Sequence, residues 1–167
     1  ILVLCVISVL FIRSAQAYMG GDQWRMQIIW IAAGTVAYAV MALVDYHVWM
    51  RYAHYLYGLS LLALSLVFFG PEIYGAKRWI DLGLFKIQPA EGAKLAALVL
   101  GSSILARSEI GSLRESIKGI VKVALCFAFP MFLIFLQPDL GSTLVFPPMV
   151  FSLLYVAKIP SRFFAAT

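Results

Sequence analysis

The chain has 167 residues, of which 63% are apolar and 13% are charged, and its formal net charge is +5. Soluble domains hold roughly 45–50% apolar and about 25% charged residues. The composition therefore excludes a water-soluble globule, a disordered chain and a nucleic-acid-binding domain. It predicts an integral membrane protein. Because lipid-exposed backbone must satisfy its own hydrogen bonds, the expected fold class is all-α, a polytopic bundle of membrane helices.

About six apolar segments follow one another along the chain, and each is predicted to form one helical span, for which ~20 residues are needed. They lie near residues 1–12, 26–44, 52–69, 89–106, 119–136 and 140–157. We interpret residues 1–167 as a single transmembrane domain. The first segment is too short to cross a bilayer and is interpreted as a truncated span. A signal peptide is the alternative, because Ala15-Gln16-Ala17 has the form of a cleavage site.

Prolines and charged loops refine this prediction. Pro130 and the pair Pro147-Pro148 fall within the last two segments and predict kinks there, since proline lacks an N–H group. The loops after the second, fourth and sixth segments carry more Lys and Arg than the alternate loops. The positive-inside rule therefore places those loops in the cytoplasm, and residues 70–88 and 137–139 then face outward.

Glu91 and Lys94 are ionisable residues near the start of the fourth segment. They are three positions apart, so they share a helix face and can pair. An acid in a first helical turn after a proline is favoured by the helix dipole, but a lysine one turn deeper is not. Two interpretations stay open: a structural ion pair, or a pair that lines a polar cavity.

A near-repeat links the starts of two segments that run in the same direction. Gln88-Pro89-Ala90-Glu91 opens the fourth segment, and Gln137-Pro138-Asp139 opens the sixth. Asp139 is expected either to cap its helix, with Gln137 satisfying backbone groups, or to line a cavity that receives a ligand.

The loop before the fourth segment combines two cations, an indole and an acid, at Lys77, Arg78, Trp79 and Asp81. Such a segment is typical of a membrane interface, where Trp lies at headgroup depth and the cations meet lipid phosphates. The same groups are also able to bind one ligand: an arginine clamps a diphosphate with paired donors, and an indole stacks on a sugar ring.

These motifs resemble the SEDS family (shape, elongation, division and sporulation). The first runs from Gly75-Ala76-Lys77-Arg78-Trp79-Ile80 to Gln88-Pro89-Ala90-Glu91 and Lys94-Leu95, and the second is Gln137-Pro138-Asp139-Leu140-Gly141-Ser142. Ala90 departs from the family pattern, where Ser is expected. Ile80-Asp81-Leu82-Gly83 is closer to the elongation branch, RodA, than to the division branch, FtsW. The resemblance covers essentially the whole chain and identifies it as the N-terminal portion of such a protein.

The resemblance implies a peptidoglycan glycosyltransferase of about ten spans in the bacterial plasma (inner) membrane. Enzymes of this family polymerise lipid II, the undecaprenyl-diphosphate-linked disaccharide-pentapeptide, into glycan strands on the outer face of the membrane. Their partner is a class B penicillin-binding protein, and cell elongation, shape and division depend on them. A lipid II flippase and a non-enzymatic scaffold of the cell-wall machinery are the alternatives.

The resemblance also implies roles for individual residues. Trp79 matches a family residue important for activity, and Glu91 and Lys94 match a pair that lines the family's central cavity. Asp139 matches the acid of the second motif, and these four residues are the candidate catalytic group. The neighbouring polar residues are the candidate substrate-binding group: Lys77, Arg78, Asp81, Gln88 and Gln137. The family's key catalytic Asp is expected beyond Thr167, so we expect this chain to be inactive alone. No metal-binding motif is present, although a divalent cation, Mg²⁺ or Mn²⁺, would suit a diphosphate leaving group.

Overall fold

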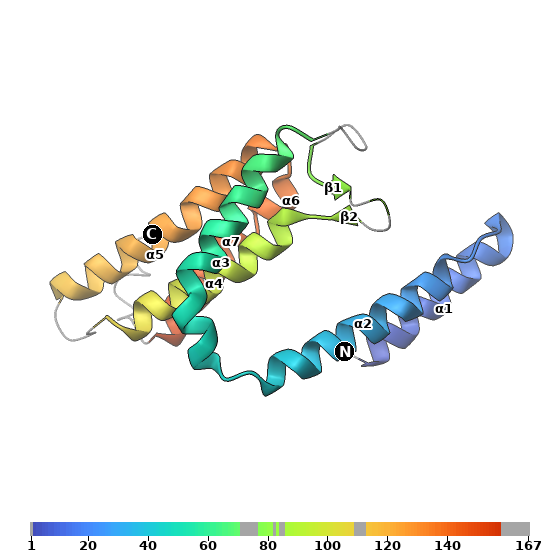
Figure 1. The fold of residues 1–167 in the computed structure, drawn as a ribbon, viewed down its shortest axis with the longest axis horizontal. Helices are drawn as coiled ribbons and strands as arrows, with labels where there is room; N and C mark the ends of the chain where they lie inside the picture. Colours follow the sequence, from blue (N-terminus) through green and yellow to red (C-terminus); the bar gives the residue numbers. More distant parts are fainter. Residues whose placement is uncertain (1, 71–76, 82, 84–85, 109–112, 158–167) are drawn as a thin grey trace. The chain divides into compact units, whose positions relative to one another are not determined.

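The structure is a computed structural model that describes residues 2–70, 77–81, 83, 86–108 and 113–157, without the side chains of residues 18–19 and 113–116. The chain divides into two compact units, Ile1–Tyr46 and His47–Thr167. Each unit is described by itself (Figure 1).

The first unit is a pair of helices, α1 (Leu2–Met19) and α2 (Gln23–Leu43), which pack along each other. Its turn uses two glycines at positive φ, Gly20 and Gly21. The first helix is therefore longer than the predicted segment 1–12, because it continues through the polar residues after that segment and ends just before Gly20. At the turn, the guanidinium groups of Arg13 and Arg25 lie 5.6 and 5.3 Å from the centre of the Trp24 ring, a cation–π arrangement.

The second unit holds the remaining elements, in the order α3 (Tyr46–Val67), β1 (Ile80–Asp81), β2 (Lys86–Ile87), α4 (Pro89–Ala106), α5 (Leu113–Leu136), α6 (Leu140–Thr143) and α7 (Phe146–Val156). The two strands form a short antiparallel hairpin. The predicted all-α membrane bundle is confirmed, and the hairpin is an addition that composition does not predict. The fifth helix begins at Leu113, earlier than the predicted segment 119–136.

α5 is the centre of this unit, because it packs against α4, α6 and α7. The buried face of α4 is rich in small side chains, including Ala93 and Ala97, with Leu100 and Leu105 further along it. Opposite it, the ring of Phe127 is 1% exposed and stands edge-on to Phe146. Small residues at a helix interface let two backbones approach closely, which is how membrane helices gain packing energy.

The last predicted span, 140–157, is not one helix. α6 ends at Thr143 and α7 begins at Phe146. Pro147 and Pro148 have no N–H to donate to the carbonyls four residues earlier, so the helix is interrupted there and starts again with proline in its first turn. Pro130, by contrast, lies within α5, which continues from Leu113 to Leu136.

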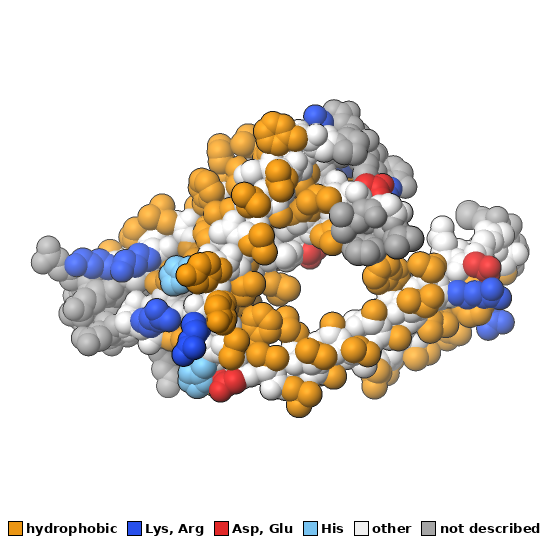
Figure 2. Space-filling view, in the orientation of Figure 1, with side chains coloured by type: hydrophobic (Ala, Val, Ile, Leu, Met, Phe, Trp, Pro, Cys, Tyr) orange, Lys and Arg blue, Asp and Glu red, His pale blue; other side chains and the backbone are white. Residues whose placement is uncertain are grey.

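Two helices among the described residues are long and apolar enough to cross a membrane by length and composition: Gln23–Leu43, with mean hydropathy 1.8, and Ile117–Leu136, with mean hydropathy 2.3. Figure 2 shows apolar side chains over much of the surface of both units. Large side chains such as Phe129 and Phe132 are more than half exposed. A soluble monomer rarely exposes so much apolar surface, whereas a lipid-facing bundle does.

Candidate functional site

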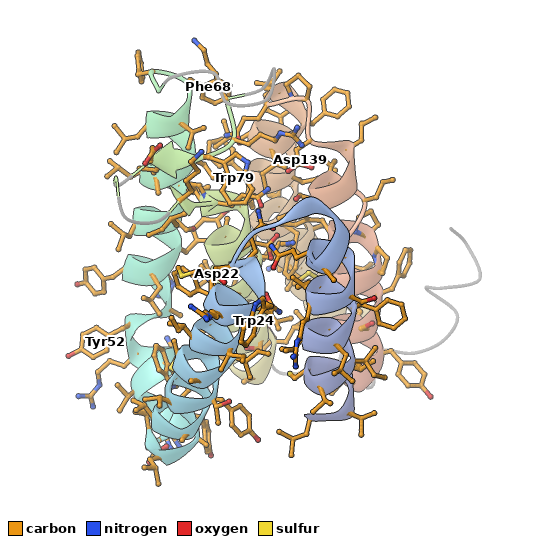
Figure 3. All side chains as sticks on the ribbon, turned by 90° about the vertical axis from the view of Figure 1, so that its right-hand side faces the viewer. Asp22, Trp24, Tyr52, Phe68, Trp79 and Asp139 are labelled. Atoms are coloured by element: carbon orange, nitrogen blue, oxygen red, sulfur yellow. The ribbon has the colours of Figure 1, made fainter. Side chains whose placement is uncertain are left out.

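Polar side chains from both sequence motifs meet at one end of the second unit. There α3 and α5 end, α4 and α6 begin, and the hairpin lies beside them (Figure 1). Figure 3 shows Trp79, Phe68 and Asp139 at this end and Tyr52 towards the other. We call the residues joined to Asp139 at this end, Arg78, Gln88 and Ser142, together with Asp139 itself, the Asp139 cluster.

Asp139 is the buried centre of this cluster, with 7% of its surface exposed. It is the N-cap of α6, and its carboxylate accepts hydrogen bonds from the Ser142 backbone N–H at 3.1 Å and the Ser142 hydroxyl at 2.9 Å. The expected capping role is therefore observed. A buried carboxylate that accepts several hydrogen bonds is held in one orientation.

Two residues of the first motif also contact this carboxylate. The Gln88 side-chain amide donates to Asp139 Oδ2 at 2.9 Å. Arg78 Nη1 lies 3.9 Å from Asp139 Oδ1, with a third of the arginine side chain exposed. The Arg78 Nε group is buried and has no hydrogen-bond partner among the described residues. Among the described residues, the cluster thus holds a guanidinium whose Nε donor has no acceptor.

The Gln137 side chain bonds to a helix end, whereas Asp139 and Ser142 of the same motif bond to each other. Its side-chain amide is buried and donates to the carbonyl of Leu64 at 3.0 Å. Leu64 lies in the last turn of α3, where the carbonyls have no partner within the helix. Gln137 therefore ties the end of α5 to the end of α3 and satisfies a buried backbone acceptor.

Glu91 and Lys94 form the predicted ion pair, with 2.8 Å between Lys94 Nζ and Glu91 Oε1. The Lys94 side chain is 15% exposed and that of Glu91 is 63% exposed. The lysine is thus the shielded partner. No contact joins this pair to Asp139 among the described residues, and the role of both residues in a cavity stays a prediction.

The remaining candidates lie in the hairpin and the residues before it. Lys77 Nζ donates to the carbonyl of Phe68 at 3.4 Å, which fastens the segment to the end of α3. Asp81 accepts from the Gly83 N–H at 2.8 Å, a local turn. Trp79 is partly buried. Gly75 and Ala76 of the first motif lie outside the described residues.

A metal ion has no evident site in the described part of the chain. No group of three or more His, Cys, Asp or Glu residues is close enough to hold one there. The oxygens of Asp139 already accept hydrogen bonds. These residues do not fit a resident cation.

Sequence reasoning placed Asp139 and Gln88 on separate helices and did not connect them. The near-repeat could have predicted their contact. Two helices that run in the same direction and both begin after Gln-Pro have those beginnings at the same end of the bundle. Ser142 was also missed as a partner of Asp139. Its position three residues after an N-cap is the ordinary signal for that contact.

The comparisons with known proteins agree with these motifs. The family model for FtsW, RodA and SpoVE, described as cell cycle protein, matches residues 1–167. A probable peptidoglycan glycosyltransferase FtsW of Thiomicrospira cyclica is 32% identical over 152 residues, covering 88% of this chain and 39% of that protein. The peptidoglycan glycosyltransferase RodA of Treponema pallidum is 31% identical over 166 residues, covering 96% of this chain and 38% of that protein.

Solved structures give the same result. A chain from a peptidoglycan synthase complex that coordinates polymerization and crosslinking matches with a TM-score of 0.79 and 30% identity, over 99% of this chain and 49% of that one. The rod shape determining protein RodA of Thermus thermophilus matches with a TM-score of 0.75 and 29% identity, over 99% and 55%. The chain thus spans about two fifths of the curated relatives named above.

The family match covers every residue, and the two motifs that meet at the Asp139 cluster are those from which the SEDS resemblance was predicted. Relatives named FtsW and RodA match at similar identity, so the elongation branch stays a prediction. The chain belongs to the FtsW/RodA/SpoVE family, a family of polytopic membrane proteins.

Proposed function

We propose that the protein to which this chain belongs is a peptidoglycan glycosyltransferase that polymerises lipid II at the outer face of the bacterial plasma membrane. The observation that carries the proposal is the Asp139 cluster, in which the Gln88–Asp139 hydrogen bond joins the two family motifs. Beside it lies a buried Arg78 Nε that has no hydrogen-bond partner within the described part of the chain. The names of the relatives support the activity.

The proposed reaction transfers one glycan to another. The 4-hydroxyl oxygen of a GlcNAc attacks the anomeric carbon of a MurNAc, whose bond to undecaprenyl diphosphate breaks. The electron pair leaves with the diphosphate, and the hydroxyl proton passes to a base. The transition state has oxocarbenium-ion character, so stabilising the departing anion lowers the barrier.

Within this scheme Arg78 binds the leaving group. Its guanidinium lies 3.9 Å from Asp139 and a third of the side chain is exposed, so its planar fork of donors can bind phosphate oxygens. Asp139 is a positioning residue rather than the base, because its oxygens already accept from Gln88 and Ser142. Lys94, with Glu91 as its partner, supplies a second cation at the same end of α4.

The partner is proposed to be a class B penicillin-binding protein, which would crosslink the strands that this enzyme makes. The support is the similarity to a chain of a complex that coordinates polymerization and crosslinking. The charge distribution supports placing the Asp139 cluster at the outer face. Basic residues, including Arg107 and Lys122, lie at the other end of the second unit, and such residues are enriched on the cytoplasmic side.

The test is polymerisation of purified lipid II by the protein expressed from its complete gene, with and without its penicillin-binding partner. Trp79→Ala and Lys94→Ala are expected to abolish glycan chains on gels. Trp49→Ala and Lys118→Ala are matched controls far from the Asp139 cluster and should polymerise like the wild type.

The alternatives predict other results. Transfer of lipid II across vesicle membranes without any polymer would favour a flippase. Failure to do either, with intact binding of the partner, would favour a scaffold. Wild-type polymerisation by both alanine variants would remove Trp79 and Lys94 from the site.

A further inference from the structure

Pro130 leaves one carbonyl in the middle of α5 without its normal helical partner. In an α-helix each carbonyl accepts a hydrogen bond from the N–H four residues later, so the carbonyl of Cys126 would pair with residue 130. Proline has no N–H to donate. Pro130 is less than 2% exposed and Cys126 is 7% exposed, so little water reaches this carbonyl. A buried acceptor without a donor is costly, and the position therefore needs a partner from outside the helix.

Tyr57 of α3 supplies that partner. Its hydroxyl donates to the Cys126 carbonyl at 2.8 Å, across 69 positions of the chain. The Cys126 thiol also lies 3.9 Å from the carbonyl of Ala97 in α4, so this residue contacts two neighbouring helices. Membrane helices tolerate a proline where a neighbouring helix satisfies the backbone group that the proline leaves unpaired. The Tyr57 hydroxyl thus takes the place of the missing N–H.

A second hydrogen bond joins α3 to the chain on the other side of the proline. The Gln137 side chain donates to the carbonyl of Leu64 at 3.0 Å. Tyr57 and Leu64 both belong to α3. Their partners, Cys126 and Gln137, stand before and after Pro130 in the sequence. The helix α3 therefore connects the two segments whose relative direction the proline leaves adjustable.

The kink angle at Pro130 determines where Asp139 lies. From position 130 to position 139 the chain extends ~13 Å at 1.5 Å per residue. A change of ~10° in the kink would therefore move Asp139 by ~2 Å. The hydrogen bond from Gln88 to this carboxylate is 2.9 Å long, and a shift of that size would break it. The geometry of the Asp139 cluster thus depends on a fixed angle in α5.

We propose that Tyr57 is a positioning residue that fixes the kink of α5 at Pro130. By donating to the Cys126 carbonyl, it holds the Asp139 cluster in its observed geometry. The consequence for catalysis rests on the proposed glycosyl transfer, in which Arg78 binds the departing diphosphate. A displacement of about 1 Å at a reacting centre can lower the rate about 100-fold, so a distant hydroxyl is able to affect the reaction without touching substrate.

A double-mutant cycle tests the contact in the protein from its complete gene. Tyr57→Phe removes the hydroxyl and keeps the ring, whereas Pro130→Ala restores an N–H for the Cys126 carbonyl. Tyr57→Phe should lower the melting midpoint by about 2 °C in the wild-type background, but by less than about 0.5 °C in the Pro130→Ala background. Pro130→Val serves if Pro130→Ala does not fold. The control Tyr55→Phe, at a residue of α3 that is 76% exposed, should leave the midpoint unchanged in both backgrounds.

Hydrogen exchange and kinetics test the positioning. In Tyr57→Phe the Ser142 N–H, which donates to Asp139, should exchange about tenfold faster, while N–H groups in the middle of α4 keep their protection. The kcat for lipid II should fall about tenfold with KM changed less than about twofold, because the leaving group is stabilised in the transition state. Adding Pro130→Ala to Tyr57→Phe should restore both the protection and the kcat.

Three results would overturn the proposal. Equal midpoint shifts of Tyr57→Phe in both backgrounds would show that its hydroxyl does not substitute for the proline N–H. Exchange that becomes equally faster in α4 and at Ser142 would show general destabilisation. An unchanged kcat in Tyr57→Phe, with an active wild type, would show that the contact does not serve the reaction. A wild type that polymerises nothing would instead contradict the proposed function, and the exchange result would still decide whether Tyr57 positions the Asp139 cluster.

Discussion

Gln88 and Asp139 are 51 positions apart in the chain, and their side chains are joined by a 2.9 Å hydrogen bond. One residue precedes α4 and the other precedes α6, so the bond fixes two helix starts at a common level. Arg78 approaches the same carboxylate from the segment before the hairpin. A single buried acid thereby orders three separate stretches of chain.

Asp139→Ala should lower the stability of the second unit. It removes the cap of α6, worth about 1 kcal/mol, and leaves the buried Ser142 N–H without its acceptor, at about 1–3 kcal/mol. The half-buried Gln88 amide also loses its acceptor, at a smaller cost because water can reach it. The measurement is thermal unfolding in detergent. Asp139→Asn keeps an oxygen acceptor and should lose less, and Asp81→Ala, in an exposed turn, should lose least. An unchanged midpoint for Asp139→Ala would show that the cluster is not stabilising.

Gln137→Leu should destabilise the protein although it adds an apolar side chain to a buried position. The carbonyl of Leu64 would lose its partner, and the cost is about 1–3 kcal/mol. Hydrogen exchange at the end of α3 checks this directly, since that helix end should become less protected. Gln27→Leu, which removes a longer 3.3 Å contact in the first unit, is the control. Equal protection in both variants would contradict the role assigned to Gln137.

Two glycines of α4 should respond oppositely to alanine. A Cβ at Gly101 would lie 2.7 Å from Phe127 Cε2 and 2.9 Å from Leu153 Cδ2, so Gly101→Ala should cost about 1–3 kcal/mol through overpacking. A Cβ at Gly92 meets nothing within 4 Å, so Gly92→Ala should stabilise by roughly 0.5–1 kcal/mol. Melting midpoints of the two variants should shift in opposite directions. A similar shift in both would mean that α4 does not pack as described.

Arg78→Lys tests the proposed contact with the leaving group. It keeps the charge but removes the planar fork of donors, including the buried Nε. We expect kcat/KM for lipid II to fall about tenfold, while unfolding in detergent is little changed. Arg25→Lys, at an exposed position in the first unit, should have no effect. Full activity in Arg78→Lys would contradict the proposed contact with the leaving group and would leave Arg78 as a residue that binds lipid headgroups.

Local features of this protein were readable from its sequence. The apolar segments locate the helices, Pro89 opens α4, and Pro147-Pro148 marks the interruption that divides the last predicted span. The Glu91–Lys94 pair follows from spacing alone, since residues three apart on a helix are neighbours. These features depend on backbone geometry over a few residues, and that geometry is the same in any helix.

Tertiary structure decided which of these local features meet. The sequence spacing of Gln88, Asp139 and Arg78 does not predict that the Asp139 carboxylate contacts both other side chains. It also does not predict that Gln137 donates to the carbonyl of Leu64. The hydrogen bond from Tyr57 to the Cys126 carbonyl is equally non-local. Such contacts depend on how α3, α4 and α5 are rotated and shifted against one another. That arrangement results from packing many side chains at once, including Gly101 against Phe127, and no short stretch of sequence contains it.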